Sequence, residues 1–154
     1  MPANKAKPSD KKILIVDDDD SIIAMLKMAF SIEGFEVSTA RDGREILKKA
    51  NQFKPDLIIS DLMMPGGGGY EVLRSLQSDP LTQKVPVFMI TGSHMAASTK
   101  EMMQQEPNLA GYFEKPVRPE TLIRAVHKRL NTLSREEERS LQRKEPPTNF
   151  SDAF

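Results

Sequence analysis

Short apolar segments rich in β-branched residues alternate along this chain with longer segments whose apolar residues recur at helical spacing. The short segments are typical of buried strands, whereas a recurrence every three or four positions is typical of amphipathic helices. The first pattern predicts strands at 12–16, 35–39, 55–61, 85–90 and 109–113. The second predicts helices at 21–33, from 42 or 43 onward, at 70–77, at 95–105 and at 119–133.

Cap and turn residues bound these elements. Asp20 or Ser21 is suited to cap the first helix, and Gly34 is suited to end it. The glycines at 66–69 predict a pliable loop. The alternative, a phosphate cradle, is disfavoured because the segment lacks the Gly-Lys-Ser/Thr ending of a P-loop. Residues 134–137 have the pattern of a capping box, so a fresh helix is expected there; the alternative is one long helix that reaches residue 145.

The alternation of strands and helices, in units of roughly 20 to 30 residues, indicates an α/β fold with a parallel sheet covered by helices on both faces. The length of 154 residues suits one domain with a short tail. We expect residues 1–10 to be a disordered lead-in, 11–133 to form the domain, and 134–154 to be a charged tail, helical or disordered. That tail is a solvated helix face or, alternatively, a coiled linker to a further domain.

Composition excludes several classes of function. The 22 Lys and Arg residues balance 22 Asp and Glu residues, so overall charge gives no attraction to nucleic acid or to a membrane. The absence of cysteine excludes disulfides, thiolate metal sites and cysteine nucleophiles. No apolar run approaches the roughly 20 residues that cross a bilayer, and the first residues lack a secretory apolar core. We therefore expect a cytoplasmic protein that binds neither membranes nor nucleic acid directly.

Chemically useful side chains stand where the predicted strands end. Asp17 and Asp18 follow the first strand and Asp61 ends the third, whereas Thr91 and Lys115 follow the fourth and fifth. Parallel strands connected by right-handed crossovers bring all their carboxyl ends to one edge of the sheet, where ligands bind. We therefore expect three carboxylates, a hydroxyl and an ammonium to converge there.

Three clustered carboxylates need compensation, because two charges about 4 Å apart repel by roughly 4 kcal/mol at an effective dielectric constant near 20. Lys115 supplies one positive charge, and a hard divalent cation could supply two more. Carboxylates without His or Cys favour Mg²⁺. A carboxylate beside such an ion can accept a phosphoryl group as a nucleophile.

Asp19 and Asp20 are interpreted as the solvated start of a helix, and the lone His94 and His127 as surface residues.

The ordered set of motifs resembles the receiver domains of two-component response regulators, including the chemotaxis regulators. The matching segments are 13–18, 55–65, Gly69, 91–92 and 112–116. The resemblance covers roughly residues 11 to 132 and implies a flavodoxin-like, doubly wound, five-stranded parallel sheet in the order 2-1-3-4-5, with five flanking helices.

The resemblance also implies the metal site and its chemistry. Asp61 would take a phosphoryl group from a sensor histidine kinase or a phosphotransfer protein. Asp17, Asp18, Asp61 and the backbone carbonyl of Met63 would bind Mg²⁺. No enzymatic activity is implied beyond slow self-catalysed phosphoryl transfer and autodephosphorylation.

Three further residues would form the switch. Thr91 and Lys115 would contact the phosphoryl group, and the rotamer of Tyr112 would report the state of Thr91; alternatively, Tyr112 is a core residue. The Lys115–Pro116 peptide bond is expected to be cis, as in the family. Phosphorylation would change the surface of the fourth helix, fifth strand and fifth helix, which would bind a downstream protein, a missing output domain or a second copy in a homodimer.

Two other functions are weaker. A receiver-like protein-binding module that works without phosphorylation would normally lack one of Asp18, Asp61, Thr91 or Lys115, and all four are present. Enzymes on similar sheets fit less well. A flavodoxin-type binder needs a phosphate loop where four aspartates stand, and a dehalogenase-like phosphatase needs an acid where Met63 stands.

Overall fold

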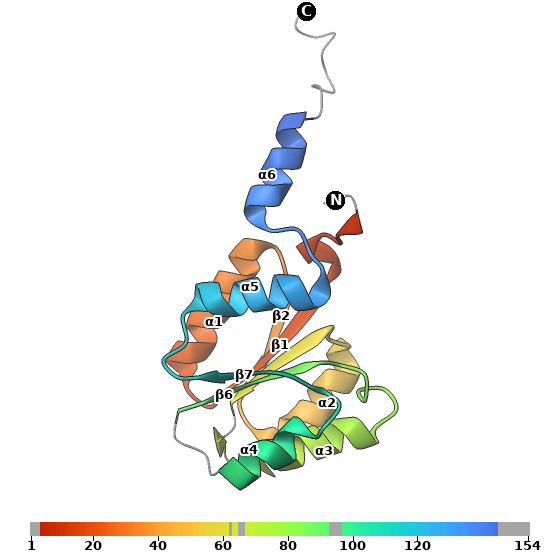
Figure 1. Ribbon diagram of the computed structural model, residues 1–154, viewed down its shortest axis with the longest axis vertical. Helices are drawn as coiled ribbons and strands as arrows, with labels where there is room; N and C mark the ends of the chain where they lie inside the picture. Colours follow the sequence, from red (N-terminus) through yellow and green to blue (C-terminus); the bar gives the residue numbers. More distant parts are fainter. Residues whose placement is uncertain (1–3, 62, 65–66, 93–96, 145–154) are drawn as a thin grey trace, which may run out of the picture.

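The computed structural model describes residues 4–61, 63–64, 67–92 and 97–144. Five parallel strands form one sheet in the order β2-β1-β3-β6-β7, which is the predicted order 2-1-3-4-5 of the five main strands (Figure 1). These strands are β1 (Lys12–Val16), β2 (Glu36–Ala40), β3 (Leu57–Asp61), β6 (Val87–Thr91) and β7 (Leu109–Glu114).

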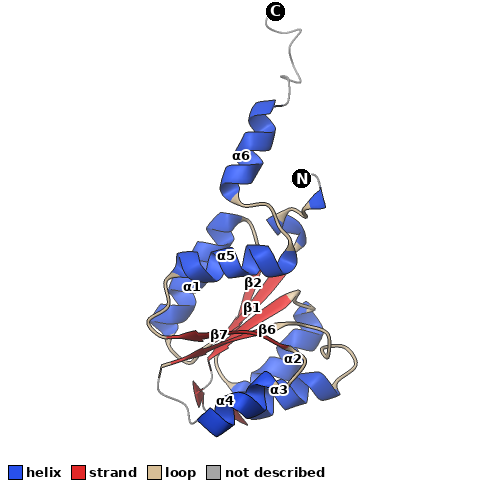
Figure 2. Ribbon diagram, viewed as in Figure 1, coloured by secondary structure: helices blue, strands red, loops and turns tan. Residues whose placement is uncertain are grey.

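Helices cover both faces of this sheet (Figure 2). They are α1 (Asp20–Glu33), α2 (Gly43–Phe53), α3 (Gly69–Ser78), α4 (Ala97–Gln104), α5 (Pro119–Leu130) and α6 (Arg135–Lys144). The helices α1 and α5 lie on one face and α2, α3 and α4 on the other, whereas α6 projects beyond the layers. The predicted α/β fold is therefore confirmed. No helix in the described ranges is long and apolar enough to cross a membrane.

The central strands are buried on both sides, which explains their unbroken apolar runs. In β1, Ile13 and Ile15 pack among residues of α1 and α5. Their neighbours Leu14 and Val16 pack among residues of α2 and α3. The strand therefore runs through the middle of the core and ends directly before Asp17.

Side-chain caps fix where two helices begin. Asp19 caps α1, because its backbone is still extended (φ −91°, ψ 113°) whereas Asp20 is already helical. The prediction of Asp20 or Ser21 as the cap was therefore wrong by one or two residues. Gly34 ends α1 at φ 109°, as predicted, and Asp42 caps α2.

The glycine-rich segment is more structured than the predicted pliable loop. Met63–Met64 (β4) and Gly67–Gly68 (β5) pair as a short antiparallel ribbon, and Gly69 begins α3. Ladder hydrogen bonds use backbone groups alone, so glycines can form them without side chains. Residues 62, 65 and 66 lie outside the described part of the chain.

The N-terminal arm, residues 4–10, contradicts the expected disordered lead-in. Ala6 donates its N–H to the carbonyl of Asn131 at 3.0 Å and accepts from the N–H of Leu133 at 2.9 Å. A short 3₁₀ helix follows at Pro8–Asp10, and Pro8 is buried beside Gly34. The arm is ordered by these tertiary contacts. Its own sequence has no apolar periodicity from which they could be predicted. Residues 1–3 are outside the described ranges.

The capping box predicted at 134–137 is confirmed, so the alternative of one long helix is wrong. The Ser134 N–H donates to Glu137 Oε1 at 3.3 Å, and the Glu137 N–H donates to Ser134 Oγ at 3.1 Å. Asn131 ends α5 in the left-handed conformation, at φ 53°. Lys5 Nζ reaches Glu137 Oε2 at 2.9 Å, so the arm also holds the first turn of α6.

His127 is not the surface residue that its isolation in the sequence suggested. Its side chain is 10% exposed, with Nε2 at 2.9 Å from Glu33 Oε1 and Nδ1 at 2.7 Å from Thr132 Oγ1. The ring also packs at 5.3 Å from the ring of Phe35. It therefore joins α5 to the end of α1. His94 lies outside the described residues.

Candidate functional site

The carboxyl ends of four strands bring the predicted site residues to one edge of the sheet. Asp17 follows β1, Asp61 ends β3, Thr91 ends β6 and Lys115 follows β7. The parallel register aligns them, since Asp61 pairs with Ile90, the neighbour of Thr91. The convergence expected from the strand pattern is therefore present in the structure.

Three carboxylates meet at this edge. One oxygen from each of Asp17, Asp18 and Asp61 lies within 4.8 Å of the others, and we call this set the acid cluster. Asp17 is 2% exposed and Asp61 is 6% exposed, whereas Asp18 is exposed. Two of the three charges thus lie where water screens them weakly, and the third faces solvent.

Lys115 bridges the acid cluster. Its Nζ lies 3.1 Å from Asp61 Oδ2 and 3.4 Å from Asp17 Oδ2. The backbone N–H of Lys115 donates to the Thr91 carbonyl at 2.7 Å, which fixes the start of the β7–α5 loop against β6. The Lys115–Pro116 bond is cis, as the family resemblance implied.

The site's electrostatics leave negative charge in excess. Burial raises the pKa of Asp17, and the Asp61 charge adds to this, while the Asp19 N–H and Lys115 oppose it. Burial also disfavours the Lys115 ammonium, but its hydrogen bond to Asp61 and the charges of Asp61 and Asp17 outweigh that effect and raise its pKa. One stable ammonium, in contact with Asp17 and Asp61, therefore lies beside a cluster of three carboxyl groups.

This donor set fits a magnesium ion. The acid cluster offers hard carboxylate oxygens close together, and Mg²⁺ prefers such oxygens and retains several waters. Because Asp18 is exposed, one side of the acid cluster is open to water. Met63 begins β4 two residues beyond Asp61, so its carbonyl follows the cluster directly in the chain.

Thr91 and Tyr112 lie on the neighbouring strands β6 and β7, with Thr91 at the end of β6 and Tyr112 opposite Met89. Thr91 is 1% exposed. Tyr112 is partly buried and packs against the core on the α2–α3–α4 side, while Lys100 Nζ of α4 lies 5.1 Å from its ring centroid. The ring thus combines a core contact with a cation–π contact at the surface, and the structure is compatible with both readings of Tyr112.

Asp19 contacts a member of the acid cluster, although its place in the sequence predicted only the start of a helix. Its backbone N–H donates to Asp17 Oδ1 at 2.9 Å, while its own carboxylate caps α1. In a run of four aspartates any member could be the cap, and the backbone conformation selects this one. The interpretation of Asp19 as the start of a helix is correct, but its contact with Asp17 had no sequence signal.

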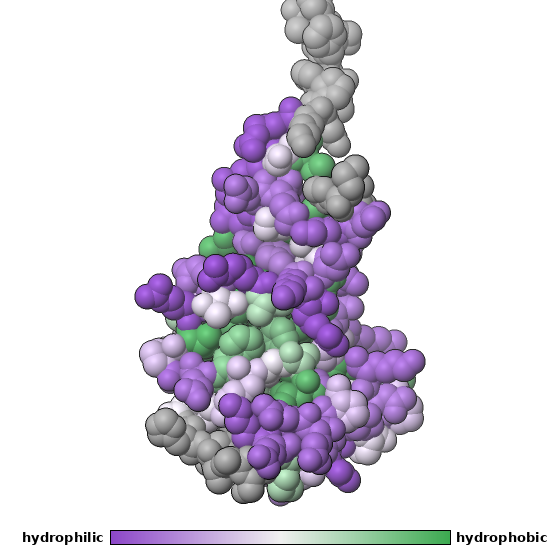
Figure 3. All heavy atoms as spheres, in the orientation of Figure 1, coloured by the Kyte–Doolittle hydropathy of each residue, from purple (hydrophilic) through white to green (hydrophobic). Residues whose placement is uncertain are grey.

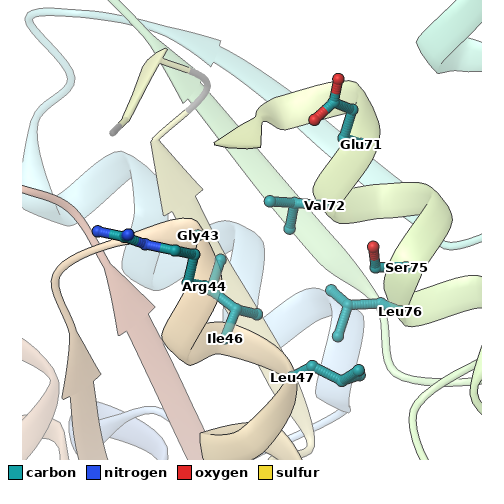
Figure 4. A pocket seen from close by; sticks show the side chains of 8 residues that line it. All are labelled: Gly43, Arg44, Ile46, Leu47, Glu71, Val72, Ser75 and Leu76. Atoms are coloured by element: carbon teal, nitrogen blue, oxygen red, sulfur yellow. The ribbon is translucent and has the colours of Figure 1, made fainter. Parts of the chain in front are cut away.

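Hollows lie beside the sheet on both of its faces. One, of about 500 Å³, adjoins Lys115 and is lined by Ile22, Met25, Leu26, Ile90, Gly92, Lys115, Pro116 and Val117. The other, of about 270 Å³, lies between α2 and α3, where Ile46, Leu47, Val72 and Leu76 form an apolar wall (Figure 4). No member of the acid cluster lines either hollow, but Lys115, whose ammonium contacts Asp17 and Asp61, lines the first.

The sequence and the fold both match known proteins. The family described as "Response regulator receiver domain" matches residues 13–127. The alkaline phosphatase synthesis transcriptional regulatory protein PhoP of Bacillus subtilis is 36% identical over 129 residues, covering 84% of this chain and 50% of that protein. The DNA-binding response regulator MtrA of Mycobacterium tuberculosis is 34% identical over 120 residues, covering 78% and 50%. The chain spans about half the length of these curated relatives.

Solved structures agree with this. The chemotaxis response regulator CheY4 of Vibrio cholerae matches with a TM-score of 0.69 and 33% identity, covering 77% of this chain and 97% of that chain. A putative response regulator from Chloroflexus aurantiacus matches with a TM-score of 0.70 and 32% identity, covering 79% and 98%. The family match, the strand order and the residues at the carboxyl edge of the sheet therefore show that the chain belongs to the response regulator receiver domains of two-component systems.

Proposed function

We propose that this protein is a phospho-accepting switch in which Asp61 takes a phosphoryl group in a magnesium-dependent reaction. The observation that carries the proposal is the position of Asp61. Its carboxylate lies at the end of β3, 3.1 Å from the Lys115 ammonium and within 4.8 Å of the Asp17 and Asp18 oxygens. A buried carboxylate beside an ammonium and further acids suits phosphoryl chemistry better than a structural role.

The phosphoryl donor would be a phosphorylated histidine of a sensor kinase or a phosphotransfer protein. A carboxylate oxygen of Asp61 attacks phosphorus, and an O–P bond forms as the N–P bond breaks. The leaving imidazole nitrogen keeps the electron pair of that bond. Lys115, already paired with Asp61, is placed to neutralise charge on the transferred group, and Thr91 can donate its hydroxyl hydrogen to a phosphoryl oxygen.

The acid cluster would supply the metal dependence. Asp17, Asp18, Asp61 and the Met63 carbonyl would hold Mg²⁺, which when bound neutralises negative charge on the phosphoryl oxygens. Lys115 has a separate task, because its ammonium pairs with the carboxylates before transfer and with the phosphoryl group afterwards. The product adds nearly two negative charges and three acceptor oxygens to this edge.

The switch surface would consist of α4, β7 and α5. The Lys115 N–H donates to the Thr91 carbonyl, and Tyr112 on β7 contacts Lys100 of α4. A change at Thr91 would therefore reach this surface through a backbone hydrogen bond and through packed side chains. Figure 3 shows apolar surface between α5 and α4, where Ala110 and Phe113 of β7 are partly exposed. This face would contact the downstream target, an output domain or a second copy.

The donor protein would dock on α1. Met25, Met28 and Ile32 are 43%, 65% and 57% exposed and share one face of that helix at helical spacing. Met25 also lines the apolar hollow that adjoins Lys115. Apolar contacts there would place a phosphorylated histidine near Asp61.

The test is the intact mass after incubation with a small phosphodonor and Mg²⁺, for the wild type, Asp61→Ala and the isosteric Asp61→Asn. One added phosphoryl group is expected on the wild type alone, and it should not form when a chelator is present. Asp20→Asn removes a nearby acid that is outside the cluster and should be labelled like the wild type.

Full labelling of both Asp61 variants would refute the assignment of the acceptor. No labelling of any form, either by small donors or by phosphotransfer proteins, would instead favour a protein-binding module that works without phosphorylation. Thermal melts of the variants without metal would show that each one is folded.

A further inference from the structure

We propose that Asp19 is a positioning residue for the acid cluster. Its backbone N–H holds the Asp17 carboxylate in the orientation that metal binding requires, and its side chain holds that N–H in place by capping α1. The proposal rests on the magnesium-dependent phosphorylation proposed above and assigns to Asp19 a task that neither the family resemblance nor the sequence pattern indicated.

The Asp17 carboxylate is held at both oxygens. Oδ1 accepts the Asp19 N–H at 2.9 Å, and Oδ2 lies 3.4 Å from Lys115 Nζ. The Asp17 backbone is also fixed, since its N–H donates to the Ala40 carbonyl of β2 at 3.1 Å. Of the two contacts to the carboxylate, the one from Asp19 is shorter and comes from backbone, so it has less freedom to move.

The Asp19 side chain immobilises that backbone. Its Oδ1 accepts from the Ser21 N–H at 2.9 Å, from Ser21 Oγ at 2.6 Å and, more weakly, from the Ile22 N–H at 3.4 Å. Its carbonyl accepts the first helical hydrogen bond, from the Ile23 N–H at 3.1 Å. The first turn of α1 and the orientation of the Asp17 carboxylate thus depend on one residue.

Asp19 acts on the cluster without being a member of it. Among the described acids, the three whose oxygens converge are Asp17, Asp18 and Asp61, whereas the Asp19 carboxylate is engaged at the helix start. Asp18 lies in the chain between Asp17 and Asp19, and the hydrogen bond between those two residues therefore also restricts the backbone of Asp18. Without the cap, repulsion among the carboxylates would turn Asp17 toward solvent, because a fixed donor would no longer oppose it.

The experiment is an Mg²⁺ titration followed by NMR through the backbone amides of Asp17 to Asp19. Loss of an outer contact that orients a metal ligand typically weakens metal affinity by 10- to 100-fold. Asp19→Ala keeps the N–H that contacts Asp17 but removes the cap that fixes it, so it should raise the Kd for Mg²⁺ by about tenfold, the low end of that range. Asp19→Asn and Asp19→Ser retain a capping oxygen and should stay within about threefold of the wild type.

Two control variants separate positioning from other effects. Asp42→Ala removes the comparable cap of α2, where Asp42 Oδ1 accepts the Arg44 N–H at 2.7 Å, and it should leave the Mg²⁺ affinity within about twofold of the wild type. Asp20→Asn removes a negative charge near the acid cluster, together with the Asp20–Arg41 ion pair, at a residue outside the cluster, so it reports the effect of a lost nearby charge.

A second readout needs no metal. The Asp19 amide should exchange its hydrogen more slowly than its exposed position suggests in the wild type, Asp19→Asn and Asp19→Ser, and about tenfold faster in Asp19→Ala. Equal Mg²⁺ affinity in Asp19→Ala and Asp42→Ala would overturn the proposal, as would equal weakening in Asp19→Ala and Asp19→Asn. A wild type that does not bind Mg²⁺ would overturn both this proposal and the metal dependence beneath it, so the two failures are distinguishable.

Discussion

Lys115 contacts two members of the acid cluster, and this position lets a single residue compensate part of the cluster's negative charge. An ammonium between carboxylates relieves their repulsion before any cation or phosphoryl group arrives. The order of strand ends predicted this residue, because Lys115 follows the last strand of a parallel sheet. The distances that give it two partners depend on the β7–α5 loop, whose shape has no simple sequence signal.

Lys115→Ala should lower the free energy of unfolding in chelator by about 1 kcal/mol, because it removes charge-assisted hydrogen bonds to the buried Asp61 and Asp17. We also expect the variant to bind Mg²⁺ about as well as the wild type while losing most of the response of the α4–β7–α5 surface to phosphorylation. Mg²⁺ titration and chemical shifts of that surface with and without phosphodonor would measure the two effects. A variant that loses Mg²⁺ binding but switches normally would contradict this division of tasks.

Asp17→Asn should stabilise the protein in chelator at neutral pH. Since the pKa of Asp17 is raised in the fold, the folded state favours the protonated carboxyl, and stability falls as pH rises above the ordinary value of 3.8. The amide mimics the neutral form, so the variant should melt at a higher temperature than the wild type in chelator at neutral pH. Below pH 3.8 the two proteins should converge, and Mg²⁺ should stabilise the wild type alone.

At the element scale, capping and close packing decide details that periodicity leaves open. The capping box of α6 could be predicted because its Ser and Glu are spaced as the motif requires. The cap of α1 could not, because four consecutive aspartates offer equivalent oxygens. The edge strand β7 adds a glycine, Gly111, whose small size matters because a β-carbon there would lie 3.0 Å from the rings of Phe88 and Phe113.

Gly111→Ala should therefore lower the free energy of unfolding by about 1 to 2 kcal/mol, because two packed rings must move to admit the methyl group. Gly92→Ala is the matched control, since a β-carbon there would lie 3.5 Å from Lys115 Cδ, an ordinary contact. Urea denaturation of both variants would measure the difference. Equal stabilities would show that the rings of Phe88 and Phe113 adapt without cost.

At the scale of the whole molecule, the two ends of the sheet carry different features. The acid cluster occupies the carboxyl end, while the N-terminal arm and α6 lie together at the other end (Figure 1). The alternation of strands and helices predicted the sheet and hence the convergence of Asp17, Asp61 and Lys115. It could not predict the arm, because the Lys- and Pro-rich residues before β1 become ordered through contacts with residues more than a hundred positions away.

Removing the arm should loosen α6 while sparing the acid cluster. A protein lacking residues 1–7 would lose the Ala6 hydrogen bonds and the Lys5–Glu137 ion pair. We expect the amides of α6 to exchange about fivefold faster, which corresponds to about 1 kcal/mol, and the Mg²⁺ affinity to be unchanged. Lys7→Ala, at an exposed residue of the same arm, is the control. Unchanged exchange in α6 would show that its capping box suffices to hold it.

The Lys5–Glu137 ion pair gives α6 a second attachment to the domain. The chain connects α6 to α5, and the arm connects it to β1, the central strand that ends at Asp17. A helix attached only through its linker can rotate about that linker, whereas a second contact restricts this rotation. A force on α6 is therefore shared between α5 and, through the N-terminal arm, the strand at the centre of the sheet.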